Sequence, residues 1–140
     1  MSRIASFADG FTSATAPTLE GASQDDYTLL NNQASATDVT GLVFSSVEYK
    51  SAFLDFTLTR SDDTPLLFTQ TGSAIASYDG STWSLEFGNF IGDSLIQDTL
   101  TNDEHVILSI TGVGQVQYQT GNMGTGHSCE LSISSIRILA

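Results

Sequence analysis

The sequence predicts an all-β protein: an antiparallel jelly-roll-like sandwich of about eight strands with an extended N-terminal arm. Polar and apolar residues alternate along most of the chain, and helical spacing is nearly absent. Turn-forming sequences such as Asp-Gly and Gly-x-Gly separate the alternating runs. The length of 140 residues suits one domain with its own core, which needs neither a disulfide nor a metal.

The N-terminal arm is predicted to cover residues 1–26, and a single β-domain to cover residues 27–140. The arm carries large apolar residues at irregular spacing among Ala, Ser, Thr and Gly. Such a segment either adds a strand to its own domain or binds a neighbouring subunit, and the sequence leaves both open. For the second case, the candidate interface residues are Arg3, Ile4, Phe7, Phe11 and Leu19.

The first strands of the β-domain are predicted at Tyr27–Asn31, Thr40–Phe44, Ser51–Arg60 and Leu66–Thr71. Ser51–Arg60 has the clearest pattern, because Leu54, Phe56 and Leu58 alternate with polar residues. This period of two places the apolar side chains on one face of a half-buried strand.

A β-hairpin is predicted around Asp79-Gly80, between the alternating runs Ala74–Tyr78 and Thr82–Phe87. Both turn positions of a two-residue hairpin favour positive φ, which Asp-Gly tolerates. After this hairpin, Asp93–Leu100 is the one stretch that we consider for a helix.

The last strands are predicted at Val106–Thr111, Gln115–Gln119 and Ser128–Leu139. Gly112-Val113-Gly114 joins the first two as a tight hairpin. In the last strand the apolar positions change parity, which predicts a β-bulge at Ser134-Ser135.

The charge balance excludes several classes of partner. The chain has sixteen acidic residues and four basic ones, which gives a net charge of −12. Nucleic-acid binders neutralise phosphates with Lys and Arg, and an anionic surface is repelled by DNA and by anionic membranes. We therefore expect neither nucleic-acid nor membrane binding.

The single cysteine and the N-terminus bear on where the protein is made. Cys129 alternates with Leu131 and Ile133, so we interpret it as a small core residue and not as a reactive thiol. No run reaches the ~20 apolar residues of a membrane helix. The N-terminus lacks the apolar stretch of a signal peptide, so we expect synthesis in the cytoplasm without a secretion signal.

Residues capable of catalysis or metal binding do not combine into a recognisable catalytic motif. His105 follows an acidic loop, where a solvent-facing histidine is expected, and His127 lies in a Gly-rich segment without a nucleophile elbow. The acidic pairs are interpreted as solvated loop residues, with Ca²⁺ binding as the alternative: Asp25-Asp26, Asp62-Asp63 and Asp103-Glu104. We predict no catalytic residue, no metal and no cofactor, and hence no enzyme activity.

The aromatic residues allow two interpretations. An exposed set could form a platform on which sugars stack, whereas alternation of Trp83 with Leu85 and Phe87 favours packing in the core. The residues considered for the platform are Tyr49, Tyr78, Trp83 and Tyr118.

Three segments in order, Thr37–Phe44, Tyr78–Leu85 and Gly114–Tyr118, resemble a small β-domain of structural proteins in tailed bacteriophages. The resemblance spans about Tyr27 to Leu139 and is most similar to the capsid cement, or decoration, proteins. It implies a jelly roll on the outer capsid surface of the virion that joins subunits of the major capsid protein. It also implies a homo-oligomer, for which we favour a dimer over a trimer. The alternative is a tail-associated module that binds a receptor or carbohydrate.

Overall fold

The computed structural model describes residues 25–45, 50–64 and 66–139. Within these ranges every regular element is a β-strand. The predicted arm, including all five of its candidate interface residues, lies outside the described residues apart from Asp25 and Asp26, and Tyr49 lies outside them as well.

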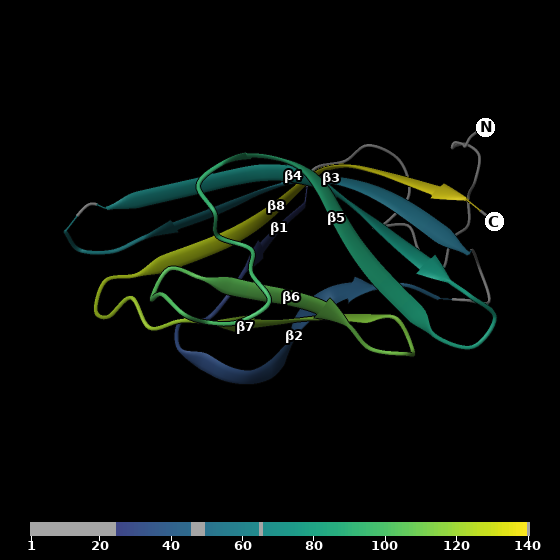
Figure 1. The fold of residues 1–140 in the computed structure, drawn as a ribbon, viewed down its shortest axis with the longest axis horizontal. Helices are drawn as coiled ribbons and strands as arrows, with labels where there is room; N and C mark the ends of the chain where they lie inside the picture. The colour runs from purple at the N-terminus through teal and green to yellow at the C-terminus, as the bar shows by residue number, and fades with distance from the viewer. Residues whose placement is uncertain (1–24, 46–49, 65, 140) are drawn as a thin grey trace.

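Eight strands form two sheets, which confirms the predicted all-β, two-layer architecture (Figure 1). One sheet has five strands in the order β1-β8-β3-β4-β5, and the other has three in the order β2-β7-β6. All pairs of neighbouring strands are antiparallel. The strands are β1 (Asp25–Thr28), β2 (Gln33–Val43), β3 (Ser51–Ser61), β4 (Leu67–Tyr78), β5 (Trp83–Gly92), β6 (Val106–Ile110), β7 (Gln115–Thr120) and β8 (Ser128–Leu139).

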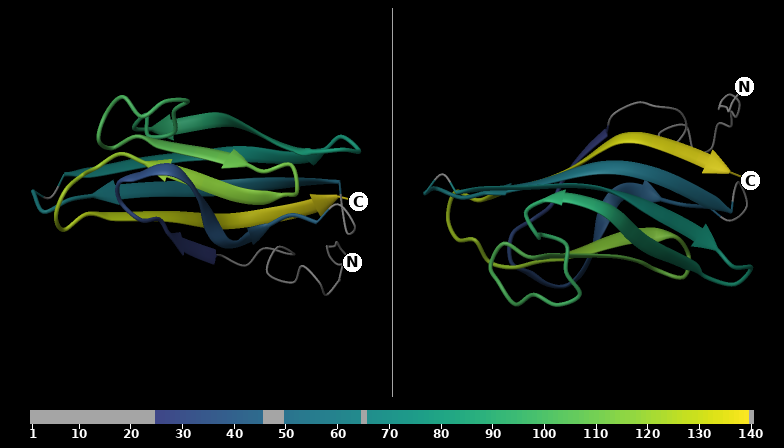
Figure 2. Two further views of the ribbon diagram at one scale, coloured as in Figure 1. Left: turned by 90° about the horizontal axis from the view of Figure 1, so that it is seen from below. Right: turned by 45° about the horizontal axis from the view of Figure 1, so that its top comes forward.

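The pairing of the strands has the nested character of a jelly roll. β1 pairs with β8 in the larger sheet, and β2 pairs with β7 in the smaller one. Each of these two pairs brings an early strand of the described chain next to a late one. β3 also pairs with β8, and hairpins join β3-β4-β5 and β6-β7. Seen from below, the smaller sheet lies in front of the middle of the larger one (Figure 2).

The predicted hairpins form at the expected turns. Asp79 Oδ1 accepts hydrogen bonds of 2.8 Å from the backbone N–H groups of both Ser81 and Thr82. Gly80 has φ of +99°, as the turn requires. The second hairpin turns at Gly114, whose φ is +97°.

Two sequence predictions are wrong. Leu66–Thr71 and Ala74–Tyr78 were expected as separate strands, but they form the single strand β4, with Gly72 in its interior. Gly72 is needed there because an added Cβ would lie within about 3 Å of the Phe56 and Phe90 rings. The helix considered at Asp93–Leu100 is absent, since this segment is an irregular connection.

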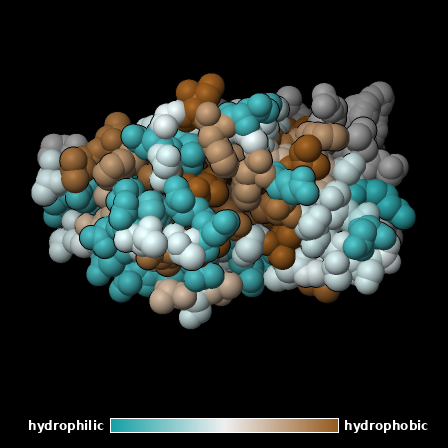
Figure 3. Space-filling model, in the orientation of Figure 1, coloured by the Kyte–Doolittle hydropathy of each residue, from teal (hydrophilic) through white to brown (hydrophobic). Residues whose placement is uncertain are grey.

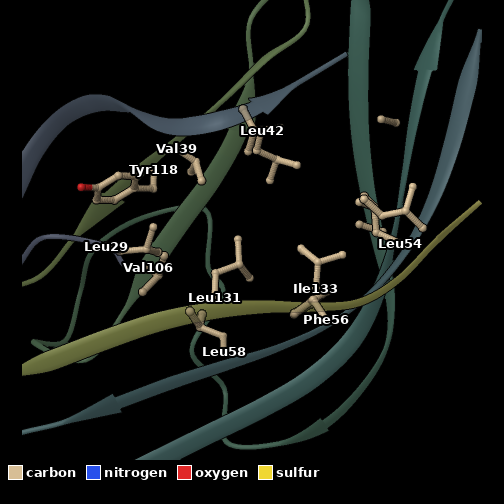
Figure 4. Close-up of a cluster of buried hydrophobic side chains, with 14 of the residues drawn as sticks. Leu29, Val39, Leu42, Leu54, Phe56, Leu58, Val106, Tyr118, Leu131 and Ile133 are labelled. Carbon is tan, nitrogen blue, oxygen red and sulfur yellow. The ribbon is translucent and has the colours of Figure 1, made fainter. Parts of the chain in front are cut away.

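The core lies between the two sheets and is built from the alternate residues of facing strands (Figure 4). Leu54, Phe56 and Leu58 of β3 are buried as predicted. They face side chains of the smaller sheet, including those of Val39, Leu42, Val116 and Tyr118. Burial of such side chains stabilises a domain by roughly 1.5–3 kcal/mol each.

Three further core predictions can be checked. Cys129 is buried, which confirms its interpretation as a core residue. Trp83 is only 5% exposed, and its ring lies 5.6 Å from those of both Phe44 and Tyr78. Tyr118 is buried too, and its hydroxyl accepts a hydrogen bond from the Leu30 backbone N–H. Core packing of Trp83 is therefore confirmed, and neither Trp83 nor Tyr118 is exposed as a sugar platform would require.

Two β-bulges interrupt the larger sheet. The predicted bulge in β8 is confirmed: Asp55 and Phe56 oppose Ser135 and Ile133, leaving Ser134 as the extra residue. A second bulge, which the sequence analysis missed, lies in β5 at Asn89, whose φ is +57°. Each bulge changes which later residues of its strand face the core.

Candidate functional site

The two histidines both lie in loops of the described chain. His105 is 7% exposed and not solvent-facing, which corrects the sequence prediction. Its Nδ1 lies 3.1 Å from the Thr101 hydroxyl and accepts a 3.2 Å hydrogen bond from the Asn102 backbone N–H. These contacts hold the side chain as part of a folded loop. His127 Nδ1 is buried and has no hydrogen-bond partner among the described residues.

Among the acidic pairs, Asp62 stabilises a turn, whereas Asp25 Oδ2 is buried without a hydrogen-bond partner among the described residues. Asp62 Oδ1 accepts hydrogen bonds from the hydroxyl and backbone N–H of Thr64 and from the backbone N–H of Leu66. The Thr64 hydroxyl is the main cause that lowers the pKa of Asp62 below its ordinary value. No group of three or more His, Cys, Asp or Glu side chains that could hold a metal occurs within residues 25–45, 50–64 and 66–139.

The most unusual polar group is a buried arginine that sequence analysis missed. Arg60 is 0% exposed, although it lies one residue before the end of the alternating strand β3. Burial lowers the pKa of its guanidinium, and the nearby Cys129, Glu104 and Asp103 oppose that shift. Its position shares the parity of Leu54, Phe56 and Leu58, and this parity could have predicted its burial.

Oxygen acceptors from three separate loops surround the Arg60 guanidinium. Nη1 donates to the backbone carbonyls of Asp103 (3.1 Å) and His105 (3.3 Å). Nη2 donates to Asn31 Oδ1 (2.9 Å) and to the carbonyl of Gly121 (3.2 Å). Arg60 thus links β3 of the larger sheet to the loops that flank β2, β6 and β7 of the smaller one. We assign it a structural role.

An apolar surface along the free edge of the larger sheet is the first candidate for binding another molecule. β5 ends this sheet, and its residues Phe90 and Ile91 are 44% and 72% exposed. Phe90 stacks on Phe87, with ring centroids 6.1 Å apart, and meets Phe56 edge-on at 6.4 Å. Phe87 and Phe90 lie on the core-facing side of β5, whereas Ile91 pairs with Thr71 and lies on the outer side of the same edge. We call Phe87, Phe90 and Ile91, which lie on both sides of this free edge, the β5 edge patch.

The β5 edge patch continues into the space between the two sheets. β5 and β6 both end their sheets, and apolar atoms gather on the surface where these strands approach each other (Figure 3). A small cavity of about 20 Å³ lies behind this surface, lined by Leu85 and Phe87 of β5, Leu108 of β6 and other apolar side chains. An apolar surface next to unpaired strand edges is typical of protein-binding sites.

Comparisons with known proteins identify no family. No family model matches the sequence, and no curated protein matches it. Among solved structures, the tailspike protein of Acinetobacter phage vB_ApiP_P1 is similar, with a TM-score of 0.49 and 10% identity over 93% of this chain. The tailspike protein of Acinetobacter baumannii phage AM24 has a TM-score of 0.36 and 12% identity over 89% of this chain. The chain spans about a quarter of each of these proteins, 24% and 27%.

The part of the chain that the structure describes contains no helix that is long and apolar enough to cross a membrane.

Proposed function

We propose that this chain is a non-enzymatic structural protein of a tailed-phage virion, which decorates the outer face of the capsid by binding the major capsid protein. The observation that carries this proposal is the β5 edge patch, where large apolar side chains are exposed beside an unpaired strand edge. Such surfaces bind other proteins through apolar contact and added backbone hydrogen bonds. The sequence resemblance to cement proteins agrees with this role.

Two separate attachments would explain firm binding by a small protein. A specific interface buries about 1,600 Å² in total, and two linked interfaces gain affinity over either one alone. The β5 edge patch provides one contact. The N-terminal arm, through the five interface residues named above, provides the other. A homodimer would double both contacts, and its mass would be twice the 14.9 kDa of one chain.

The test uses particles that lack the protein, to which purified chains are added back. Ile91→Thr keeps the branched shape but removes apolar surface from the β5 edge patch, so we expect weaker binding to particles. Val113→Thr is the matched control, because Val113 is 81% exposed in the β6–β7 turn and outside the patch. Equal binding by both variants would remove the patch from the mechanism.

The arm is tested separately by deleting residues 1–20. We expect the deleted protein to keep the β-sandwich, as read by circular dichroism, and to lose binding to particles. Stoichiometric binding by the shortened chain would show that the arm is not an attachment.

A second candidate function is a tail-associated module that binds host saccharide. It is favoured by a polar depression on the outer face of the larger sheet, described in the next subsection. Copy number in purified particles distinguishes the two functions, because a capsid decoration protein is present in hundreds of copies and a tail protein in far fewer.

A further inference from the structure

The outer face of the larger sheet, opposite the core, carries a polar row at the level of both β-bulges. Asp55 on β3 pairs with Ser135 on β8 and with Ser73 on β4, and Ser73 in turn pairs with Gly88 on β5. The bulge in β5 adds Asn89 to this row, and the bulge in β8 adds Ser134. Polar side chains from four strands therefore lie side by side at one level of the sheet.

Hydrogen bonds within the row fix the side chains but leave polar atoms available. The Ser135 hydroxyl donates to Asp55 Oδ2 at 2.8 Å, and Asn89 Nδ2 donates to the Ser73 hydroxyl oxygen at 2.9 Å. Asp55 Oδ1 and Asn89 Oδ1 have no protein donor among the described residues. Since the Ser73 oxygen accepts from Asn89, its own proton is available to a ligand.

Two adjoining depressions share this row. Asp55, Ser73 and Asn89 line both, and their volumes are about 350 Å³ and about 300 Å³. The first depression extends along the sheet to Thr57 and Thr71 and is bordered by hydroxyl groups. We call the pair of depressions the outer trough.

The second depression adds apolar surface to the outer trough. Phe53 and Ile75 line it, and they are directly paired across β3 and β4. Each depression has the size of a small ligand site. The outer trough therefore offers a carboxylate, an amide and hydroxyl groups beside an aromatic and an aliphatic side chain.

This combination of groups matches the chemistry of a saccharide. Sugar hydroxyls donate to carboxylates and exchange hydrogen bonds with amides and hydroxyls, whereas the C–H faces of the ring pack on apolar side chains. The net charge of −12 disfavours acidic sugars, as it disfavours nucleic acid. A single carboxylate is too few oxygen ligands for a Ca²⁺ site.

We propose that the outer trough binds an uncharged oligosaccharide. Asp55 accepts hydrogen bonds from sugar hydroxyls, Asn89 accepts and Ser73 donates, and one ring packs against Phe53 and Ile75. The two adjoining depressions accommodate consecutive sugar units. The β5 edge patch meets the trough only at Ile91, whose partner Thr71 lines the first depression, and none of the three patch residues lines the trough itself. The site therefore does not rest on the capsid-decoration proposal.

In the test, the full chain labelled with ¹⁵N is titrated with millimolar maltotetraose, cellotetraose, mannotetraose and chitotetraose. Binding is detected as changes in the amide chemical shifts. We expect at least one of these probes to shift amides at residues 53–57, 71–75 and 88–90 together. Asp55→Asn preserves an oxygen that can accept from Ser135 but removes the charge, and should weaken binding by about tenfold or more.

Asn89→Gly is the second variant, because glycine keeps the positive φ while the amide is lost. It should also weaken binding, whereas Asp98→Asn, an exposed acid outside the trough, should not. The proposal is overturned if none of the four probes shifts these amides, or if Asp55→Asn binds like Asp98→Asn. Particle binding by Asp55→Asn should stay normal, so this result is separate from the decoration test.

Discussion

Replacing Arg60 by methionine tests whether the buried guanidinium holds the two sheets together. Methionine has a similar length and suits an apolar environment, but it donates no hydrogen bond. The substitution leaves the carbonyls of Asp103, His105 and Gly121, and Asn31 Oδ1, without their shared donor.

The expected magnitude follows from how deeply each bond is buried. Only the bond to the His105 carbonyl is fully buried, whereas the other three are partly buried, so water can replace the lost donor there. Three of the four acceptors keep another donor, because the His105 carbonyl also accepts from the Gly121 N–H, the Gly121 carbonyl from the Asn32 N–H, and Asn31 Oδ1 from the Met123 N–H. The loss is therefore mainly that of the charge-assisted hydrogen bonds themselves, which contribute about 1.5–3 kcal/mol each. Removing the charge also relieves its burial cost of several kcal/mol, including that of the unpartnered Nε. We therefore expect a net loss of about 2–4 kcal/mol.

Urea unfolding followed by fluorescence provides the assay, since Trp83 is the only tryptophan and is buried in the core. With a slope of about 2 kcal/mol per molar urea, the midpoint should fall by about 1–2 M. Arg60→Lys should be at least as harmful, because it keeps a buried charge without the planar fork that reaches four acceptors. Thr59→Val, on the opposite face of β3, should stay within about 0.5 kcal/mol. A stable Arg60→Lys variant would refute the reasoning, because charge alone would then suffice.

Two further predictions concern backbone and pH. Gly114→Ala should destabilise the fold by about 1–3 kcal/mol, because φ is +97° and an added Cβ would collide with the Phe44 carbonyl; Gly88→Ala, with open space around it, should change the thermal midpoint little. Burial raises the pKa of Cys129 to about 11, so the folded state holds its thiol proton longer than the unfolded state does. Stability from this group is complete below about pH 9 and is lost as the pH rises toward 11, a decline of about 3 kcal/mol that Cys129→Ala should remove in urea titrations at increasing pH.

Local patterns predicted the strands well wherever one face is buried. The alternation in Ser51–Arg60 and the parity change at Ser134-Ser135 correspond to β3 and to the bulge in β8. Both signals are local, because they record which side of a strand meets the core. The same rule applied to Arg60 would have found the buried guanidinium.

The errors arose where a distant contact determines a local choice. Gly72 resembles a turn signal in the sequence, but it serves the packing of aromatic rings from β3 and β5. Leu95 and Ile96 have apolar side chains suited to a helix, yet their backbone N–H groups donate to the Oε1 of the buried Gln70 on β4. The pairing of β1 with β8 and of β2 with β7 likewise joins residues that are far apart in the sequence, such as Asp25 with Ile133 and Gln33 with Thr120, which no short window of sequence contains.

The candidate surfaces were hardest to predict because one inserted residue builds parts of both. Leu85 and Phe87 face the core side of β5, so strict alternation would also turn Asn89 inward and Phe90 outward. The bulge reverses this order. Asn89 then reaches Ser73 in the outer trough, and Phe90 joins Phe87 in the β5 edge patch. A strand without the bulge would place an amide against the apolar edge and a phenyl ring in the polar trough. The bulge therefore puts the amide on the face suited to saccharide and the phenyl ring on the face suited to protein, and it turns Ile91 outward beside Thr71.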